Sequence, residues 1–427
     1  MNSEKEKTAA KTVGRPGLHY GWVVFAACFA MVFVTLGFCS SVKSLFLAPV
    51  TEDTGLPRSL FSLADCMRYV VVASLNIVFG SVVAKLGPRI MIGIGFISLA
   101  VSMFLYSISG SVLVFCIGGA FLGLGLAFST TTIVGYIVEK WFTNSKGTIM
   151  GIILAANGLG AAVASQVLSP IIEASQSGWR NAYRTSAIIV LITGIVVVAL
   201  VRNKPEDMGL EPMGKDKVAK KKNTASWSGF EFSELKKKSY FWITLAVCFL
   251  YGIIVQSYSS CSSAHMRDVG IDAQTIANVV SLNMILLFLT KTMSGFLFDR
   301  LGIRRVMALC AAAATAALLI LAFMNDNPLM AYIYSPFGAL GLPLETILMP
   351  LLAMEMFGKK PYAHVMGIVV GMIQAGSCVG MFFTNAIFDV FGSYKTILII
   401  YCIAMVVLAV VMDLMIRKAN ADRVNAE

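Results

Sequence analysis

The sequence has 427 residues, of which 57% are hydrophobic and only 13% are charged. This composition is typical of a chain embedded in lipid and argues against a water-soluble globular protein. The formal net charge of +11 would also suit a nucleic-acid-binding protein, but the positions of the basic residues, given below, explain the charge without nucleic acid.

Long apolar runs recur along the whole chain, and each is close to the roughly 20 residues that a helix needs to cross a bilayer. They predict an all-α membrane protein with twelve transmembrane helices. The first 18 residues lack the apolar core and the cleavage site of a signal peptide, so the first helix is expected to stay in place. The predicted helices are residues 20–49, 57–85, 88–109, 112–141, 146–175, 179–202, 239–266, 271–300, 304–325, 328–358, 363–390 and 393–417.

The basic residues are distributed unequally between the two sides of these helices. If both termini lie in the cytoplasm, the inner loops and tails contain 26 lysines and arginines, whereas the outer loops contain five. Basic loops remain on the cytoplasmic side of a membrane. We therefore expect a multi-pass protein of the cell (inner) membrane with both termini in the cytoplasm and its basic loops against anionic lipid headgroups.

Two segments of the first half recur in the second half. Residues 80–89 align with residues 295–304, and Trp141-Phe142 aligns with Met356-Phe357 at the same offset. Such repeats predict two pseudo-symmetric six-helix bundles with a substrate site between them, near the middle of the membrane. The expected divisions are a cytoplasmic tail at 1–18, a bundle at 19–202, a cytoplasmic linker at 203–238, a second bundle at 239–417 and a cytoplasmic tail at 418–427.

One lysine, Lys291, lies inside an apolar run. A cation in the middle of a bilayer costs at least about 3 kcal/mol on insertion scales, so such a residue is a candidate for a functional site. Lys291 is therefore the first candidate to bind an anionic substrate.

Other polar residues within the predicted helices are further candidates. Asp65 and Arg68 share a helix face, which fits either a second substrate cation with a proton-linked acid or an internal salt bridge. Lys43 would either reach water or join the site. Glu345 would either exchange a proton, as Asp65 would, or pair with a cation. Three amides are candidates to line the cavity: Asn157, Asn283 and Gln374.

The turn that follows Lys291 has an unusually constrained sequence. Its defining residues are Gly295, Asp299, Arg300, Gly302, Arg304 and Arg305. This spacing resembles the signature loop of the major facilitator superfamily, although the copy in the first half has Ala84 and Lys85 in place of Asp and Arg. The resemblance implies a cytoplasmic latch at this turn. Glu139 and Glu355, at matching helix ends, are expected to be acids of the same gate or latch.

Within that superfamily, the chain is similar to the monocarboxylate transporters and to the bacterial oxalate/formate exchangers. The similarity rests on residues 19–24, 179–183, 234–242 and 291–295. It implies that Lys291 occupies the place of an arginine that binds the substrate carboxylate. Lysine retains the charge of that arginine but not its bidentate fork.

Two positions depart from these relatives. Leu287 stands where the animal monocarboxylate transporters have an aspartate for proton coupling. The uncharged residues 374–377 stand where the oxalate/formate exchangers have a second lysine. With one firm central cation, a monovalent anion is expected rather than a dianion.

We therefore predict a secondary active transporter that moves a small organic anion, a monocarboxylate, by alternating access with proton symport. The alternatives are an anion exchanger, a facilitator for another small solute and, outside this class, a membrane sensor that does not transport. The expected partners are the carboxylate, protons or a counter-anion, and the lipid bilayer, and the protein is expected to be monomeric. The sequence has no phosphate-binding loop, nucleophile elbow or metal-ligand cluster, so no enzyme activity, cofactor or metal is expected.

Overall fold

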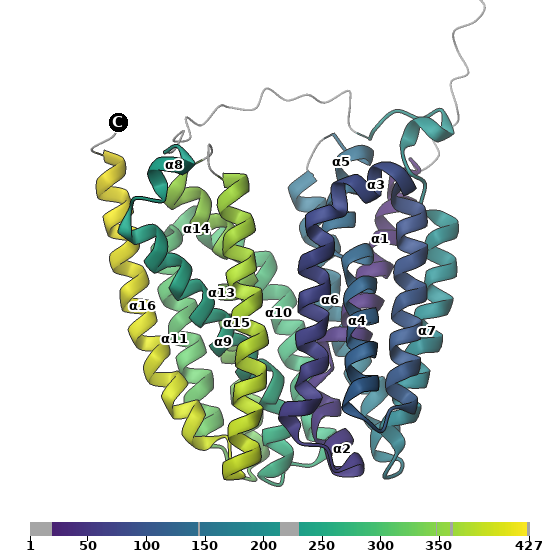
Figure 1. Ribbon diagram of the computed structural model, residues 1–427, viewed down its shortest axis with the longest axis vertical. Coiled ribbons are helices and arrows are strands. Elements are labelled where there is room, and N and C mark those ends of the chain that lie inside the picture. Colours follow the sequence, from purple (N-terminus) through teal and green to yellow (C-terminus); the bar gives the residue numbers. More distant parts are fainter. Residues whose placement is uncertain (1–18, 144–145, 214–229, 347, 359–361, 425–427) are drawn as a thin grey trace, which may run out of the picture.

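The computed structural model describes residues 19–143, 146–213, 230–346, 348–358 and 362–424. The helices form two bundles that stand side by side (Figure 1). The N-terminal bundle consists of α1 (Gly21–Leu36), the π-helical turn η1 (Gly37–Ser41), α2 (Ser44–Thr54), α3 (Arg58–Ile108), α4 (Val112–Ser129), α5 (Thr131–Trp141), α6 (Lys146–Glu173) and α7 (Gly178–Leu200). The C-terminal bundle consists of α9 (Ser239–Asp268), α10 (Ala273–Leu301), α11 (Ile303–Ala322), α12 (Pro328–Gly341), α13 (Pro343–Thr346), α14 (Leu348–Phe357), α15 (Tyr362–Phe391) and α16 (Lys395–Val424). Two short helices, η2 (Pro205–Met208) and α8 (Phe232–Leu235), lie between the bundles in the chain.

Ten helical segments within the described ranges are long and apolar enough to cross a membrane. The two predicted helices missing from this set are 57–85 and 328–358, and each is interrupted by a position outside the described part, the side chain of residue 77 in the first and residue 347 in the second. The first begins α3 and contains Arg58, Asp65 and Arg68, which lower its mean hydropathy. The second is divided into α12, α13 and α14. Both segments nevertheless pack against the other helices of their bundles.

The same glycine turn occurs in both bundles. Within α3, Gly87 has φ 74° and ψ 157°, and this kink separates the two helices predicted at 57–85 and 88–109. Gly302, which precedes α11, has φ 77° and ψ 157°. The two glycines are separated by the offset of the sequence repeat. A residue with a Cβ atom would be strained at these angles, so the same turn requires glycine in each bundle.

An arginine that follows each of these glycines attaches the turn to its own bundle. The Arg89 Nε atom donates to the Val198 carbonyl of α7 at 2.8 Å, and its backbone N–H donates to Asn203 Oδ1 at 3.1 Å. At the matching position, Arg304 Nη2 donates to Asp413 Oδ2 of α16 at 3.0 Å. The third helix of each bundle is thereby tied to the last helix of that bundle.

The two bundles are joined near the end of the molecule where α2 lies, which we call the α2 face. Hydrogen bonds and ion pairs connect residues 44–66 and 162–173 of the N-terminal bundle with residues 263–281 and 378–389 of the C-terminal bundle. Toward the opposite end, the linker face, where α8 and the end of α16 lie, the facing helices of the two bundles diverge (Figure 1). The bundles are thus closed at the α2 face and separated toward the linker face.

Candidate functional site

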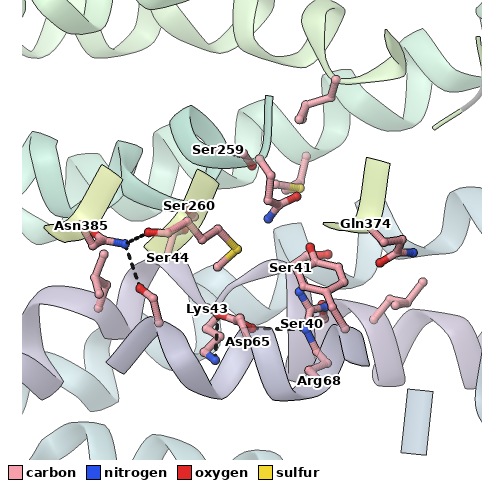
Figure 2. A pocket seen from close by; sticks show the side chains of 18 of the residues that line it. Ser40, Ser41, Lys43, Ser44, Asp65, Arg68, Ser259, Ser260, Gln374 and Asn385 are labelled. Carbon is pink, nitrogen blue, oxygen red and sulfur yellow. Dashed lines mark hydrogen bonds and ion pairs between the residues drawn. The ribbon is translucent and has the colours of Figure 1, made fainter. Parts of the chain in front are cut away.

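A cavity of about 330 Å³ lies between the two bundles. Residues of α1, η1, α2 and α3 line it from the N-terminal bundle, and residues of α9, α10 and α15 line it from the C-terminal bundle. A volume of this order is at the lower end of the range for small-molecule sites. Figure 2 shows the polar side chains that converge on this space.

Three charged side chains of the N-terminal bundle form a connected group on one wall of the cavity (Figure 2). The Asp65 carboxylate forms an ion pair with each of two cations. Its Oδ2 atom lies 2.9 Å from Lys43 Nζ, and its Oδ1 atom lies 3.2 Å from Arg68 Nε. The Asp65 side chain is only 5% exposed, and the two cationic side chains are each 12% exposed. A buried carboxylate with two cationic neighbours leaves an excess of positive charge on this wall.

Aromatic rings and a hydroxyl group complete the surroundings of these two cations. The Arg68 guanidinium lies 4.2 Å from the centre of the Tyr69 ring, and its Nη1 atom donates to Ser40 Oγ at 2.9 Å. Lys43 Nζ lies 5.2 Å from the centre of the Phe61 ring. Cations are attracted to the faces of aromatic rings, so these rings and the hydroxyl group help to hold both side chains in position.

An irregular turn in the first membrane helix brings backbone and hydroxyl groups to the same wall. The α-helical pattern of α1 changes to the π-helical turn η1 at Gly37, and a new helix, α2, starts at Ser44. Between them, Ser40, Ser41 and Lys43 line the cavity. Short π-helical segments within helices are frequent at functional sites, and discontinuous helices form the substrate sites of many transporters.

The C-terminal bundle contributes Lys291 from α10 and Gln374 from α15 to the same cavity. Lys291 is half-buried. The Oε1 atom of Gln374 is buried and accepts no hydrogen bond from the described residues, so it is available to a ligand that has a donor. Among the described residues, the charged side chains lining the cavity are the cations Lys43, Arg68 and Lys291 and the anion Asp65. This described part of the lining has an excess of positive charge when all four are ionised.

The other two amides singled out from the sequence lie elsewhere. Asn157 Oδ1 accepts a hydrogen bond of 2.7 Å from Ser41 Oγ, so Asn157 supports a cavity-lining residue from behind. Asn283 is 6% exposed, and its Nδ2 atom donates to the Ser335 carbonyl at 3.0 Å. Asn283 borders a separate cavity of about 20 Å³ next to Ser44.

The residues expected to form a latch lie toward the linker face. Arg304 pairs with Asp413 inside its own bundle, and Gly302 supplies the turn described above. Arg300 and Glu139 are exposed, and Glu355 is half-buried. The surroundings of Gly295 and the side chains of Asp299 and Glu345 lie outside the described part of the structure, although the backbones of these residues belong to α10 and α13.

Sequence reasoning missed two groups of residues. One is the hydroxyl-rich lining contributed by Ser259 and Ser260 of α9, which the serine-rich stretch at 257–263 signals in the sequence. The other is a group at the α2 face, formed by Arg58, Asp268 and Asp389. These three residues are far apart in the chain, and no local pattern predicts that they meet.

The sequence profile of the Major Facilitator Superfamily matches residues 24–265 and 259–426, which together include nearly all of the chain. The chain belongs to the Major Facilitator Superfamily. It is therefore a multi-pass membrane transporter of the secondary type and not an enzyme. The fold class predicted from the sequence is confirmed.

Comparison with individual members of the superfamily shows distant similarity over two thirds of the chain or more. The human protein monocarboxylate transporter 12 is 22% identical over 92% of this chain and 80% of its own length. The uncharacterized MFS-type transporter YcxA of Bacillus subtilis (strain 168) is 23% identical over 67% of each chain. Among solved structures, the nucleoside transporter NupG superimposes with a TM-score of 0.71 at 13% identity, covering 93% of this chain and 99% of the other. Because the named cargoes differ, the superfamily fold does not by itself specify the substrate.

Proposed function

We propose that this transporter moves a small organic monocarboxylate across the cell membrane by alternating access, in symport with protons. The observation that carries the proposal is the cavity between the bundles, whose described lining contains the cations Lys43, Arg68 and Lys291 and the acid Asp65. An anion in this cavity offsets part of the cost of holding several cations within the membrane. The distant similarity to monocarboxylate transporter 12 favours a carboxylate among the small anions.

Each charged residue has a distinct role in this proposal. Lys291 binds the carboxylate from the C-terminal bundle, so the bound anion connects the two bundles. Gln374, with its unused acceptor atom, would accept a hydrogen bond from a hydroxyl group of the substrate. Lys43 and Arg68 supply further positive charge from the N-terminal bundle.

The ion pairs of Asp65 suggest how a proton and an anion would bind together. When Asp65 is ionised, it neutralises part of the charge of Lys43 and Arg68, its neighbours at 2.9 and 3.2 Å. When it is protonated, that attraction is lost, and the substrate carboxylate replaces it. Each ligand thereby raises the affinity for the other, as thermodynamic linkage requires. Glu345 is the second candidate for the proton carrier.

The proposed orientation places the linker face in the cytoplasm. Its support is the excess of lysine and arginine in the loops and tails on that side. In this orientation both termini are cytoplasmic. The conformation described here, joined at the α2 face, then opens toward the cytoplasm.

The second candidate is an anion exchanger. The observation in its favour is that three cations line the cavity, which is enough to hold a dianion without a proton. An exchanger would move labelled anion only when another anion is present on the opposite side. A sensor that does not transport would move none.

The test is uptake of radiolabelled lactate, pyruvate, formate and oxalate by purified protein in liposomes at two external pH values. We expect uptake of a monocarboxylate that is faster at the lower external pH. Lys291→Gln should abolish this uptake, because the variant retains a polar side chain without charge. Lys395→Gln is the matched control, since Lys395 is exposed at the start of α16, near Phe323, and does not line the cavity. A Lys291→Gln protein that transports carboxylates normally would remove the central assignment.

A further inference from the structure

The first part of α3 and the last part of α15 run antiparallel along the contact between the bundles. At the α2 face, the Asp389 carboxylate accepts hydrogen bonds of 2.9 Å from the backbone N–H groups of Arg58 and Ser59. One turn further along α3, Asn385 Nδ2 donates to Ser62 Oγ at 2.8 Å. From one contact to the next, the residue number increases on α3 and decreases on α15, as expected for antiparallel helices. They define a line of contact, which we call the α3–α15 seam.

Two cysteines form the next contact along this seam. Cys66 lies one further turn along α3, and its Sγ atom lies 3.4 Å from the carbonyl oxygen of Cys378 on α15. The Cys66 thiol therefore donates across the contact between the bundles to the backbone of the second cysteine. Both cysteines are free and half-buried. A thiol pair that bridges the two bundles is therefore present in this conformation.

The cysteine pair is bordered by residues that line the cavity. Asp65, the neighbour of Cys66, lines the cavity, and so does Gln374, one turn before Cys378. Beyond the pair, toward the linker face, Val70 of α3 is 56% exposed. Ser62 and Asn385, which form the preceding contact of the seam, line the cavity themselves. The pair therefore lies next to the cavity, and small molecules in the cavity are close to it.

We propose that Cys66 and Cys378 are a modification site, at which a hydroperoxide forms a disulfide that locks the two bundles together at the α2 face. The seam has to separate when the cavity opens toward the α2 face, because its two helices belong to different bundles. A covalent bond at this position holds the carrier open toward the linker face and stops the transport cycle. Reduction of the disulfide restores the cycle.

The oxidation is balanced with hydrogen peroxide as the oxidant. One cysteine sulfur attacks the peroxide, the O–O bond breaks, and a sulfenic acid and one water form. The second thiol then attacks the sulfenic sulfur, the S–S bond forms, and a second water leaves. The two thiols together lose two electrons and two hydrogen atoms, and one peroxide is reduced to two waters. A dithiol such as dithiothreitol reverses the reaction by thiol–disulfide exchange.

The first test is chemical and needs no knowledge of the substrate. The full-length protein in liposomes is treated with hydrogen peroxide, the remaining thiols are blocked with N-ethylmaleimide, and the digested protein is analysed by mass spectrometry. We expect a peptide pair linked through Cys66 and Cys378, which disappears after treatment with dithiothreitol. Cys116→Ser is the matched control, because Cys116 is also half-buried but belongs to α4; this variant should form the same linkage. Recovery of both cysteines unlinked, or linked to other cysteines, overturns the proposal.

The second test measures the lock by hydrogen–deuterium exchange at residues 58–66 and 378–389. Peroxide should slow exchange in these segments of the wild-type protein and leave Cys378→Ser and Cys66→Ala unchanged. Equal responses of the wild type and both variants would contradict the lock. The exchange measurement does not depend on the identity of the cargo. A failure of the carboxylate proposal can therefore be distinguished from a failure of the disulfide proposal. Once a substrate is known, peroxide should stop its uptake by the wild type and not by Cys378→Ser.

Discussion

Arg58 and Asp268 form a two-point ion pair between the two bundles. The Arg58 Nη1 and Nη2 atoms donate to the two carboxylate oxygens of Asp268 at 2.6 and 2.7 Å. The guanidinium also lies 3.9 Å from the centre of the Phe388 ring and donates to the Tyr394 hydroxyl group at 3.3 Å. Bidentate pairs of this kind are among the stronger polar contacts in proteins. The pair stabilises the conformation that is closed at the α2 face.

Asp268→Asn should therefore shift the protein toward the conformation that is open at the α2 face. A hydrogen bond to a charged group contributes about 1.5 kcal/mol at the lower end of its range, which corresponds to roughly a tenfold change in the equilibrium. The lower end applies because the Asp268 side chain is 25% exposed. Faster hydrogen–deuterium exchange at residues 58–66 would report the shift. The matched control is Asp422→Asn, since Asp422 pairs with Lys238 inside one bundle at 2.9 Å; an equal response in both variants would show that the effect is not specific to the bundle contact.

A second prediction concerns the coupling of transport to protons. Asp65→Asn removes the acid that contacts both Lys43 and Arg68 but retains a side chain of the same shape. If Asp65 carries the proton, the variant should still exchange labelled for unlabelled carboxylate, whereas a pH gradient should no longer drive accumulation. Counterflow measures the exchange of labelled for unlabelled carboxylate, and uptake at two external pH values measures the accumulation driven by the pH gradient. Accumulation that still follows the pH gradient in Asp65→Asn would transfer the role to Glu345 or to another group.

The helices and several charged residues of the cavity could be predicted from the sequence because both depend on local patterns. Apolar runs mark the helices, and a cation within such a run, as at Lys291, is costly enough to indicate a site. The spacing of Asp65 and Arg68 likewise predicts that they share a helix face. The structure shows that this pair is joined by Lys43 and faces the same cavity as Lys291. The sequence had left open whether the pair is a salt bridge or part of a site, and in the structure it is a salt bridge in the cavity wall.

The remaining features depend on contacts between distant parts of the chain. Arg58 and Asp268 are separated by 210 residues, so no local pattern in the sequence predicts that they pair. The π-helical turn η1, which brings Ser40 and Ser41 to the cavity, has no sequence signal that distinguishes it from a continuous helix. For the same reason, helix periodicity alone does not show that Asn283 binds the Ser335 carbonyl and borders a different cavity.

A third prediction tests the turn that both bundles share. Gly302→Ala places a Cβ atom at φ 77° and ψ 157°, a backbone conformation that costs about 1–3 kcal/mol for residues other than glycine. The variant should therefore melt at a lower temperature than the wild type in detergent. Gly371→Ala is the control, because Gly371 is helical and has open space around the position of an added Cβ atom. A Gly302→Ala protein as stable as Gly371→Ala would mean that the turn relaxes to other angles without cost.

The last prediction asks whether Asn157 binds the substrate or only supports the residue that does. Asn157 accepts the hydrogen bond of Ser41, which lines the cavity. Because a hydrogen bond contributes about 1 kcal/mol, loss of this support in Asn157→Ala should raise the KM about fivefold, by the same factor for every carboxylate that is transported. Ser41→Ala should have a similar effect, and the double variant should be no worse than either single one, as expected for residues that act through one contact. Additive losses in the double variant, or a KM change that depends on the carboxylate, would instead identify Asn157 as a direct ligand.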